Sequence, residues 1–388
     1  MGRMTAPRTI AVLGLGRMGA AIATRLANHH GDVVGWTRSG HSTGAVETTG
    51  DPNEAVAKAD IVLLALFDGP ACRQVVDRVR DSLRTDTIVL NTSTIAPAEA
   101  SALARQLGRS YVHAPLLGSV PAAAAGTLQI LAAAGQDALD GARPVLETLG
   151  TVRRVDDAAT AAALKLIANC GLAGAVLALR DSLRQADALG LPRDQVLDVL
   201  ERGQLGGLVA RKRAFLADGP TAVPAEFTIG ALAKDMALLA AASNTPLRSA
   251  SDLAGISSAA EADIAVAATA PAVEDAVLEP LRAYIRGHVT GDASHFRDAF
   301  LPTAHIEGIR DGAFVSWHLD EYCALFHGRP APDEPTRSRR IDAIEVHGTV
   351  ATATMTLWHG ADTFTDIFLL VHDDGRWRIA NKAYHRNA

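Results

Sequence analysis

The 388-residue sequence has little of what marks secreted, metal-binding or nucleic-acid-binding proteins. Its three cysteines, Cys72, Cys170 and Cys323, are too far apart for a zinc motif or a disulfide framework, which indicates a reducing, cytoplasmic compartment. The formal net charge is −6 and there is no basic stripe, which argues against a nucleic-acid partner. The first apolar run leads directly into a glycine loop, so we expect no signal peptide.

One stretch, Ala158 to Leu179, is apolar over a length that could cross a membrane. Only Lys165 and Asn169 interrupt it. A helix that is apolar all round is buried in some medium, and a lysine is costly in lipid. We therefore expect a helix buried inside a soluble protein and no membrane partner, with a functional reason for the lysine.

A glycine-rich turn lies between an apolar run, Thr9 to Leu13, and a helical stretch that continues to Leu26. Its glycines have the spacing G-x-G-x-x-G, which allows a tight turn, close approach of a pyrophosphate and close packing of helix on strand. Phosphates would bind at the helix N-terminus, where N–H groups are unpaired. The expected cofactor contacts of this loop are Gly14, Leu15, Gly16, Arg17, Met18 and Gly19.

The end of the second strand-like run, Asp32 to Trp36, indicates which dinucleotide binds. A site for NAD usually has a carboxylate about 20 residues after the glycines, to hold the ribose 2′-hydroxyl. Here the run is followed by Thr37, Arg38 and Ser39. A cation between two hydroxyls suits a 2′-phosphate, so we expect NADP rather than NAD.

Short apolar runs alternate with helical stretches through the first 157 residues, which predicts a parallel α/β sheet of the Rossmann type. Ligands bind beyond the carboxyl ends of such strands. Three loops follow strand ends at that edge: Leu66-Phe67, Ser93-Thr94 and Leu117-Gly118-Ser119. The predicted strands are 9–13, 32–36, 60–66, 87–91, 111–114, 128–133 and 151–155.

The strand pattern stops at Ala158, and residues 158–270 are predicted to form an all-helical domain for substrate binding and dimerisation. The expected helices are 158–189, 192–203, 208–217, 229–242 and 246–266. The first of these is too apolar to face water, and the helical domain of a second copy is the expected cover. We therefore predict a homodimer or a larger assembly.

About 270 residues resemble the β-hydroxyacid dehydrogenase family, which includes 3-hydroxyisobutyrate dehydrogenases and glyoxylate or succinic semialdehyde reductases and has a cofactor domain of the 6-phosphogluconate dehydrogenase type. The similar stretches occur in the family's order: VLGLGRMGAAIATRL, LFDGPA, NTSTIAP, HAPLLGSVPAAAAGTLQI, LKLIAN and FTIGALAKDMALLAAA. The resemblance implies that Lys165 is the catalytic lysine and Asn169 a substrate-binding residue. It implies further that Thr94 and Lys234 contact the cofactor, and that Leu117-Gly118-Ser119 is the loop that holds the substrate carboxylate.

The sequence departs from the family pattern in three places. Leu117 stands where serine is usual, which removes a hydroxyl donor and suggests a bulkier or less polar substrate. His113 stands where aspartate is usual, and Ala159 and Ala161 replace two glycines.

Residues 271–388 continue beyond that family. Two helical stretches, one over 277–288 and one bearing Phe296 and Phe300 on one face, precede strand runs 341–346, 350–358, 363–371 and 377–383. Their short polar turns predict an antiparallel meander. The order resembles the NTF2-like superfamily, most closely its "putative lumazine-binding" members, and implies a cone-shaped α+β barrel. Nine of the thirteen histidines lie here, but no pair has metal-ligand spacing, so we expect no metal site.

Lys165 and Asn169 are four residues apart and so share a helix face. A lysine can give a proton to the alkoxide formed in carbonyl reduction and take it back in oxidation. Asn169, with Ser93 and the backbone at Gly118 and Ser119, would orient the substrate oxygen. The sequence thus predicts an NADP-dependent oxidoreductase acting on a small carbonyl or hydroxy-acid substrate.

Two alternatives remain open from the sequence. One is an imine reductase, which Leu117 favours and Lys165 disfavours, because those enzymes usually have aspartate or tyrosine at that position. The other is an NADP-binding sensor or scaffold without turnover, in which the NTF2-like part assembles or binds a ligand; the presence of both Lys165 and Asn169 disfavours it. Lys165 by itself could also be a lysine whose side chain extends to the surface.

Overall fold

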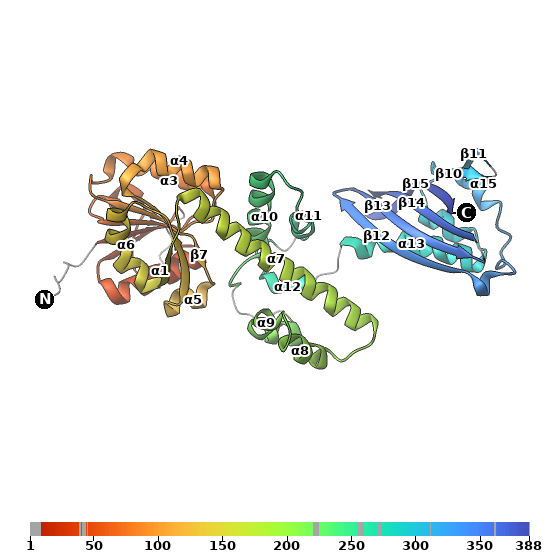
Figure 1. Ribbon diagram of the computed structural model, residues 1–388, viewed down its shortest axis with the longest axis horizontal. Coiled ribbons are helices and arrows are strands. Elements are labelled where there is room, and N and C mark those ends of the chain that lie inside the picture. Colours follow the sequence, from red (N-terminus) through yellow and green to blue (C-terminus); the bar gives the residue numbers. More distant parts are fainter. Residues whose placement is uncertain are drawn as a thin grey trace. The chain divides into compact units, whose positions relative to one another are not determined.

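A six-stranded parallel sheet organises the N-terminal part of the chain (Figure 1). The computed structural model describes residues 9–38, 40, 44, 46–219, 225–254, 256, 260–269, 273–310, 312–360 and 362–387. The strands lie in the order β3-β2-β1-β4-β5-β6, the doubly wound order whose switch point falls between β1 and β4. Their bounds are β1 (Ile10–Leu13), β2 (Val33–Trp36), β3 (Glu47–Thr49), β4 (Ile61–Leu64), β5 (Ile88–Asn91) and β6 (Tyr111–His113).

Helices cover both faces of this sheet, which explains why its strands read as continuous apolar runs. Ile10 and Val12 of β1 belong to the core under α1 (Arg17–His30) and α6 (Gln136–Leu149). Ala11 and Leu13 belong to the opposite core. The helices on that side are α2 (Pro52–Val56), α3 (Gly69–Val79) and α4 (Pro97–Leu107).

Two of the predicted strands lie outside the parallel sheet, which corrects the sequence prediction. The chain reverses after β6, so that β7 (Leu116–Leu117) pairs antiparallel with β8 (Leu128–Ala132), while β8 pairs parallel with β9 (Gly150–Arg154). These three strands form a separate sheet, with α5 (Val120–Ala125) between β7 and β8. Neither β3 nor β7 was predicted, since both are very short.

Helices alone follow, and they pack around α7 (Ala158–Ala188). The others are α8 (Arg193–Glu201), α9 (Gly206–Asp218), α10 (Ile229–Ser243), α11 (Arg248–Ala254) and α12 (Ile264–Thr269). The predicted single helix over 246–266 is wrong: α11 and α12 are separate helices, and residues 260–263, which precede α12, are not helical.

Within the described residues, α7 is the one helix long and apolar enough to span a membrane by length and composition. One of its faces packs against α4, α10 and α12 instead. Its buried residues include Lys165, Asn169 and Arg180, which fit a protein interior far better than hydrocarbon.

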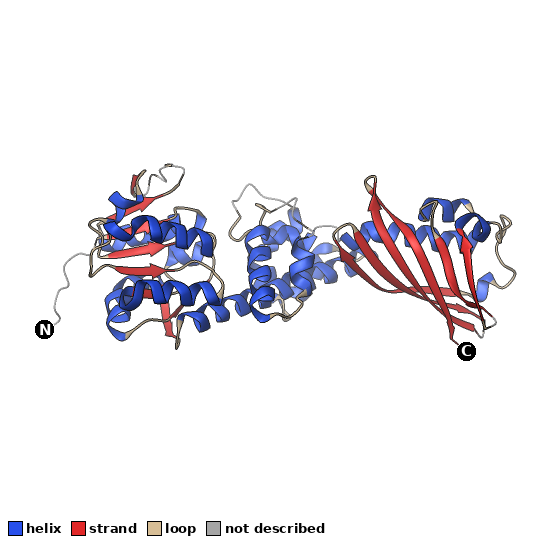
Figure 2. Ribbon diagram, turned by 90° about the horizontal axis from the view of Figure 1, so that it is seen from above, coloured by secondary structure: helices blue, strands red, loops and turns tan. Residues whose placement is uncertain are grey.

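Residues 1–269 and 270–388 form two separate units. In the second, α13 (Val273–Thr290) and α14 (Ser294–Ala299) precede a curled sheet, drawn as long red strands in Figure 2. The strand order is β11-β10-β15-β14-β13-β12, with only β10 and β15 parallel. The strands are β10 (His305–Arg310), β11 (Ala313–His318), β12 (Ser338–His347), β13 (Val350–His359), β14 (Asp362–Asp373) and β15 (Arg376–Asn387).

The predicted fold class is therefore confirmed in both units, although β10, β11 and α15 (Leu319–Cys323) were not predicted. Phe296 and Phe300 are both buried in the core beneath the sheet, but Phe300 lies just beyond the end of α14.

This core of the second unit also contains charge. Lys382 of β15 pairs with Asp366 of β14 at 2.7 Å, and Tyr284 of α13 bridges them, accepting from Lys382 at 2.6 Å and donating to Asp366 at 2.7 Å. All three side chains are buried.

Candidate functional site

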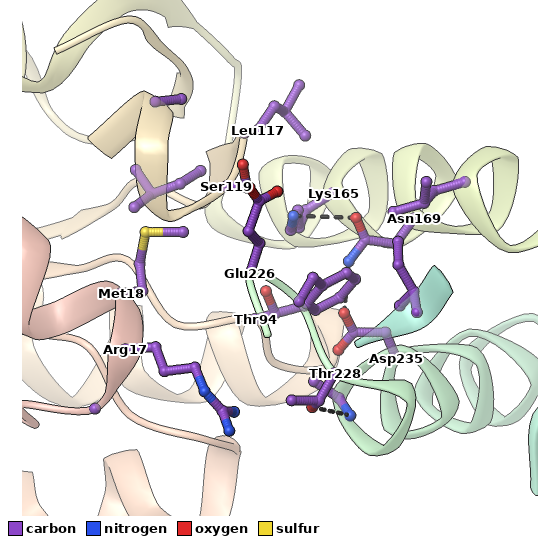
Figure 3. A pocket seen from close by; sticks show the side chains of 18 of the residues that line it. Arg17, Met18, Thr94, Leu117, Ser119, Lys165, Asn169, Glu226, Thr228 and Asp235 are labelled. Carbon is purple, nitrogen blue, oxygen red and sulfur yellow. Dashed lines mark hydrogen bonds between the residues drawn. The ribbon is translucent and has the colours of Figure 1, made fainter. Parts of the chain in front are cut away.

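A cavity of about 760 Å³ opens where the carboxyl ends of the parallel strands face the helical region of the first unit (Figure 3). The glycine loop, the loops after β4, β5 and β7, and helices α7, α9 and α10 all contribute to its wall. Of the residues predicted for the site, it is lined by Gly16, Arg17, Met18, Gly19, Leu66, Phe67, Ser93, Thr94, Leu117, Gly118, Ser119, Lys165, Asn169 and Lys234.

The glycine loop has the geometry that its spacing predicts. Gly14 has φ = +104°, a conformation that other residues rarely adopt, and a Cβ there would meet the carbonyl oxygen of Ala65. A Cβ at Gly19 would collide with the carbonyl oxygen of Gly14, so α1 packs closely on the turn. Gly16 has open space around its Cα and lines the cavity, which leaves room for a pyrophosphate.

A second cavity of about 270 Å³ lies at the end of β2 and shares Gly16, Leu66 and Phe67 with the lining of the first. The predicted residues Gly14, Leu15, Thr37 and Arg38 line it, and Arg38 is exposed. Ser39, the third residue predicted there, lies outside the described residues. Sequence reasoning missed the opposite wall, which comes from α3 and includes Gln74 and Arg78.

Lys165 is 9% exposed and does not extend to the surface. Its Nζ donates to Oδ1 of Asn169 at 3.1 Å. Burial lowers the pKa of Lys165 to about 8; the carboxylate of Asp235 acts against this, and Lys234 adds to it. An amine with a pKa near neutrality can both give and accept a proton under physiological conditions.

Asp235, which the sequence analysis missed, fixes the orientation of Asn169. Its Oδ2 accepts from Nδ2 of Asn169 at 2.5 Å, so the amide oxygen is turned toward Lys165. Figure 3 shows Lys165 and Asn169 projecting from α7 with Asp235 facing them. One amide hydrogen of Asn169 remains for a substrate. The signal was present in the sequence, because Asp235 directly follows Lys234.

Lys234 joins the helical region to the strand ends. Its Nζ pairs with Oδ1 of Asp235 at 2.8 Å and donates to the backbone oxygen of Thr94 at 2.8 Å. It also lies 5.2 Å from the ring centre of Phe67, which is 60% exposed. Lys234, Thr94 and Phe67 therefore lie together on one wall.

A chain of buried hydrogen bonds holds Ser93 in place. Its N–H donates to Oδ1 of Asn91, whose Nδ2 donates to the hydroxyl of Tyr111, which in turn bonds to Nδ1 of His113. The Ser93 hydroxyl accepts from the N–H of Leu66 at 2.9 Å. Burial lowers the pKa of His113 to about 3, so this histidine, which stands where the resemblance leads one to expect aspartate, is neutral.

The loop predicted to hold the substrate carboxylate, Leu117-Gly118-Ser119, has few polar side chains. Leu117 packs against a small apolar cluster that includes Ala161. Ser119 precedes α5 without capping it through its side chain. The loop therefore offers one side-chain hydroxyl, at 119 rather than 117, and no cation.

Three ion pairs surround the cavity besides Lys234–Asp235. At the glycine loop, Arg17 pairs with Glu261 at 3.3 Å. On the helical side, Lys212 of α9 pairs with Glu226 at 3.1 Å and with Asp263 at 3.0 Å.

Across the described parts of both units, no three His, Cys, Asp or Glu side chains are grouped as they would be around a metal ion.

Comparison with known proteins gives two family matches. Residues 9–163 match the model described as "NAD binding domain of 6-phosphogluconate dehydrogenase", and residues 272–385 match "Putative lumazine-binding". Both agree with the resemblances that the motifs indicated.

Individual relatives match the first unit. A Mycobacterium tuberculosis protein named "Probable 3-hydroxyisobutyrate dehydrogenase" is 33% identical over 201 residues, covering 50% of this chain and 68% of that protein. An NAD-dependent L-serine dehydrogenase of Pseudomonas aeruginosa is 34% identical over 157 residues, covering 37% and 52%. The structure of Mycobacterium tuberculosis 3-hydroxyisobutyrate dehydrogenase with L-serine superimposes with a TM-score of 0.59 and 27% identity, over 68% of this chain and 99% of that one.

Proposed function

The chain belongs to the 3-hydroxyisobutyrate dehydrogenase family, and we propose that it is an NADP-dependent oxidoreductase in which Lys165 is the general acid and base. The observation that carries the proposal is the position of Lys165. It is buried, bonded to Asn169, and lines the same cavity as the glycine loop.

The residues present suit a dinucleotide. Gly16 and Gly19 would leave the pyrophosphate at the start of α1, and Arg38 would meet a 2′-phosphate at the end of β2. Thr94, Phe67 and Lys234 would border the nicotinamide. When bound, that ring supplies or accepts the hydride.

Lys165 supplies the proton that balances the hydride. In reduction its ammonium gives a proton to the alkoxide oxygen as the carbonyl becomes an alcohol. In oxidation its free amine takes the proton from the hydroxyl. Asn169 holds the ammonium in place, and Asp235 holds Asn169.

The substrate is a small hydroxy acid or the corresponding aldehyde-type carbonyl compound, as the names of the relatives suggest. Ser93, Gly118, Ser119 and the remaining amide hydrogen of Asn169 would surround it. We propose further that the protein acts in the cytoplasm as a homodimer.

Replacing Lys165 by methionine tests this proposal. Methionine keeps the apolar stem but cannot move a proton, so kcat should fall about 10²–10⁴-fold. Binding of NADPH should change little, because its phosphate contacts lie elsewhere. The measurement is NADPH consumption with aldehydes, oxo acids and cyclic imines. Lys58→Met, at an exposed lysine, is the matched control.

A Lys165→Met variant that keeps most of its kcat would remove Lys165 from the mechanism. Turnover of cyclic imines alone would favour an imine reductase. NADPH binding without turnover of any compound would favour a sensor.

A further inference from the structure

An ionic clamp on the helical side of the 760 Å³ cavity joins three segments that are distant in the sequence. The ammonium of Lys212, on α9, lies 3.1 Å from a carboxylate oxygen of Glu226 and 3.0 Å from one of Asp263. The same oxygen of Asp263 accepts from the N–H of Glu226 at 3.0 Å. The three side chains are 11%, 29% and 14% exposed, so these contacts are partly shielded from water and fix the segments against one another.

Each segment of the clamp carries an apolar side chain that lines the cavity. Leu208 precedes the lysine of the clamp by one helical turn, so both lie on one face of α9. Phe227 and Ile264 directly follow its two carboxylates in the sequence. The N–H of Ile264 donates to the backbone oxygen of Phe227 at 3.0 Å, which brings these two segments together. The clamp therefore holds three apolar side chains at the cavity wall.

Helix α7 supplies a fourth apolar side chain. Leu172 lines the cavity and lies three residues after Asn169 and seven after Lys165, a spacing that keeps all three on one helix face. At a rise of about 1.5 Å per residue, Leu172 is about 10 Å from Lys165 along the helix axis. A substrate whose carbonyl group is held at Lys165 can thus extend past Asn169 to an apolar end of the cavity, formed by Leu172, Leu208, Phe227 and Ile264.

The charges beside the apolar end already have partners. The clamp pairs its lysine with two carboxylates, and Glu261 pairs with Arg17 at 3.3 Å. Arg211 also lines the cavity but is exposed, so its charge stays in water, whereas Leu208 and Ile264 are buried. An apolar group placed among the four side chains gains by leaving water, while a carboxylate there would lose its hydration without an ion-pair partner among them.

We propose that the substrate carries a bulky apolar group, aryl or branched alkyl, which binds at the apolar end while Lys165 acts on the carbonyl group. NADPH gives a hydride to the carbonyl carbon and Lys165 gives a proton to its oxygen, which yields the alcohol and NADP⁺. The substrates are then aldehydes or oxo compounds with such a group, or the corresponding alcohols. This inference rests on the proposed function and adds a subsite that selects substrates by apolar size.

A series of aldehydes that differ in apolar size tests the proposal with NADPH as reductant. Each buried CH₂ group strengthens binding about fourfold, so kcat/KM should rise about tenfold or more from propanal to 3-methylbutanal, and further to 3-phenylpropanal. The charged compound 4-oxobutanoate should be reduced less efficiently than 3-methylbutanal. Equal kcat/KM for the three aldehydes would overturn the proposal, as would a preference for 4-oxobutanoate over all of them.

Two variants locate the size preference. Leu172→Ala removes one wall of the apolar end, and the ratio of kcat/KM for 3-phenylpropanal to that for propanal should fall about tenfold or more. Ala168→Phe places a ring on the same lining face of α7, fills the space and should lower this ratio as well. The controls are Leu177→Ala and Ala178→Phe, the same changes at positions of α7 that do not line the cavity, and they should leave the ratio unchanged. An unchanged ratio in both Leu172→Ala and Ala168→Phe would contradict the assignment.

Calorimetry with amides, which NADPH does not reduce, separates this inference from the proposed function. The complex of the protein with NADPH should bind 3-phenylpropanamide at least tenfold more tightly than propanamide, and Leu172→Ala should remove most of this difference. Such binding in a protein that reduces no carbonyl compound would support the subsite and contradict the enzymatic function. Turnover of aldehydes without any preference for apolar size would do the reverse.

Discussion

At the scale of single residues, the pKa of Lys165 sets a pH dependence that differs between the two directions. Burial lowers this pKa to about 8, so the ammonium predominates below pH 8 and the amine above it. Reduction needs the ammonium, and its kcat/KM should therefore fall as pH rises through about 8. Oxidation needs the amine, and its kcat/KM should rise through the same range. Profiles that move in the same direction would contradict the assigned role.

Asp235 supplies a second test of the same group. Its carboxylate favours the charged form of Lys165 and so opposes the effect of burial. Asp235→Asn removes that charge but keeps an oxygen that can accept from Asn169. The pKa of Lys165 should fall, and both pH limbs should move to lower pH. A variant that loses activity without any shift of the limbs would show that Asp235 has only a structural role.

The choice of cofactor can be tested at Arg38. It lines the 270 Å³ cavity where a 2′-phosphate would lie. Arg38→Asp replaces a partner of the phosphate by a like charge and should weaken the binding of NADPH far more than that of NADH. The loss of one hydrogen bond to a charged group corresponds to an increase in Kd for NADPH of about tenfold or more. Arg105→Asp, at an exposed position on α4, is the control. Equal losses for both cofactors would exclude Arg38 as the 2′-phosphate ligand.

The sequence analysis could name those residues of the proposed site that carry a local signal. Three glycines at fixed spacing and a single lysine in an apolar helix can be recognised without knowing the fold. Asp235 has a weaker signal, its position directly after Lys234, and its contact with Asn169 could not be foreseen because it comes from a segment 66 residues further along the chain. Which residues of two helices meet depends on how the helices pack, and the pattern of apolar residues within one helix does not determine this.

At the scale of elements, long periodic segments were predictable and short ones were not. The α7 prediction, 158–189, agrees with Ala158–Ala188 within one residue. The pattern over 246–266 predicts one helix because alanines continue it past a glycine and several serines, although these residues favour a helix less than alanine does. The two-residue strand β7 depends on pairing with β8, and strand pairing is a tertiary property.

The strands of the second unit allow a stability test. Lys382→Met would leave the Asp366 carboxylate buried without its cation, which should lower the free energy of unfolding by about 3–5 kcal/mol. The double variant Lys382→Met/Asp366→Leu removes both charges and should be more stable than Lys382→Met alone. Three of the four tryptophans lie in this unit, so tryptophan emission during denaturation reports on it.

A double variant less stable than Lys382→Met would mean that Asp366 contributes through its bond to Tyr284 rather than through the ion pair.

At the scale of the whole molecule, a change in the order of helices and strands along the sequence indicates that the chain contains two unrelated folds. Helix–strand alternation ends at the start of α7, and long alternating strands begin only after residue 337. Sheet order and the curl of the second sheet could be expected only through the resemblances, because pairing between distant strands has no local signature.

Assembly is the remaining property at this scale. On the face of α7 turned away from its packing partners, Leu164 is 42% exposed and Ile167 58% exposed, and Gly171 and Gly174 continue the stripe. Apolar side chains beside small residues allow another helix to approach closely, and a second copy of this chain would present the same surface through a two-fold axis. Sedimentation should therefore show a dimer at micromolar concentration.

Ile167→Glu would place two like charges near that axis and should weaken dimerisation roughly a hundredfold or more. Val199→Glu, an equally apolar exposed position on α8, should leave the dimer intact. A stable monomer of the unmodified protein, or dissociation by Val199→Glu but not by Ile167→Glu, would rule out α7 as the interface.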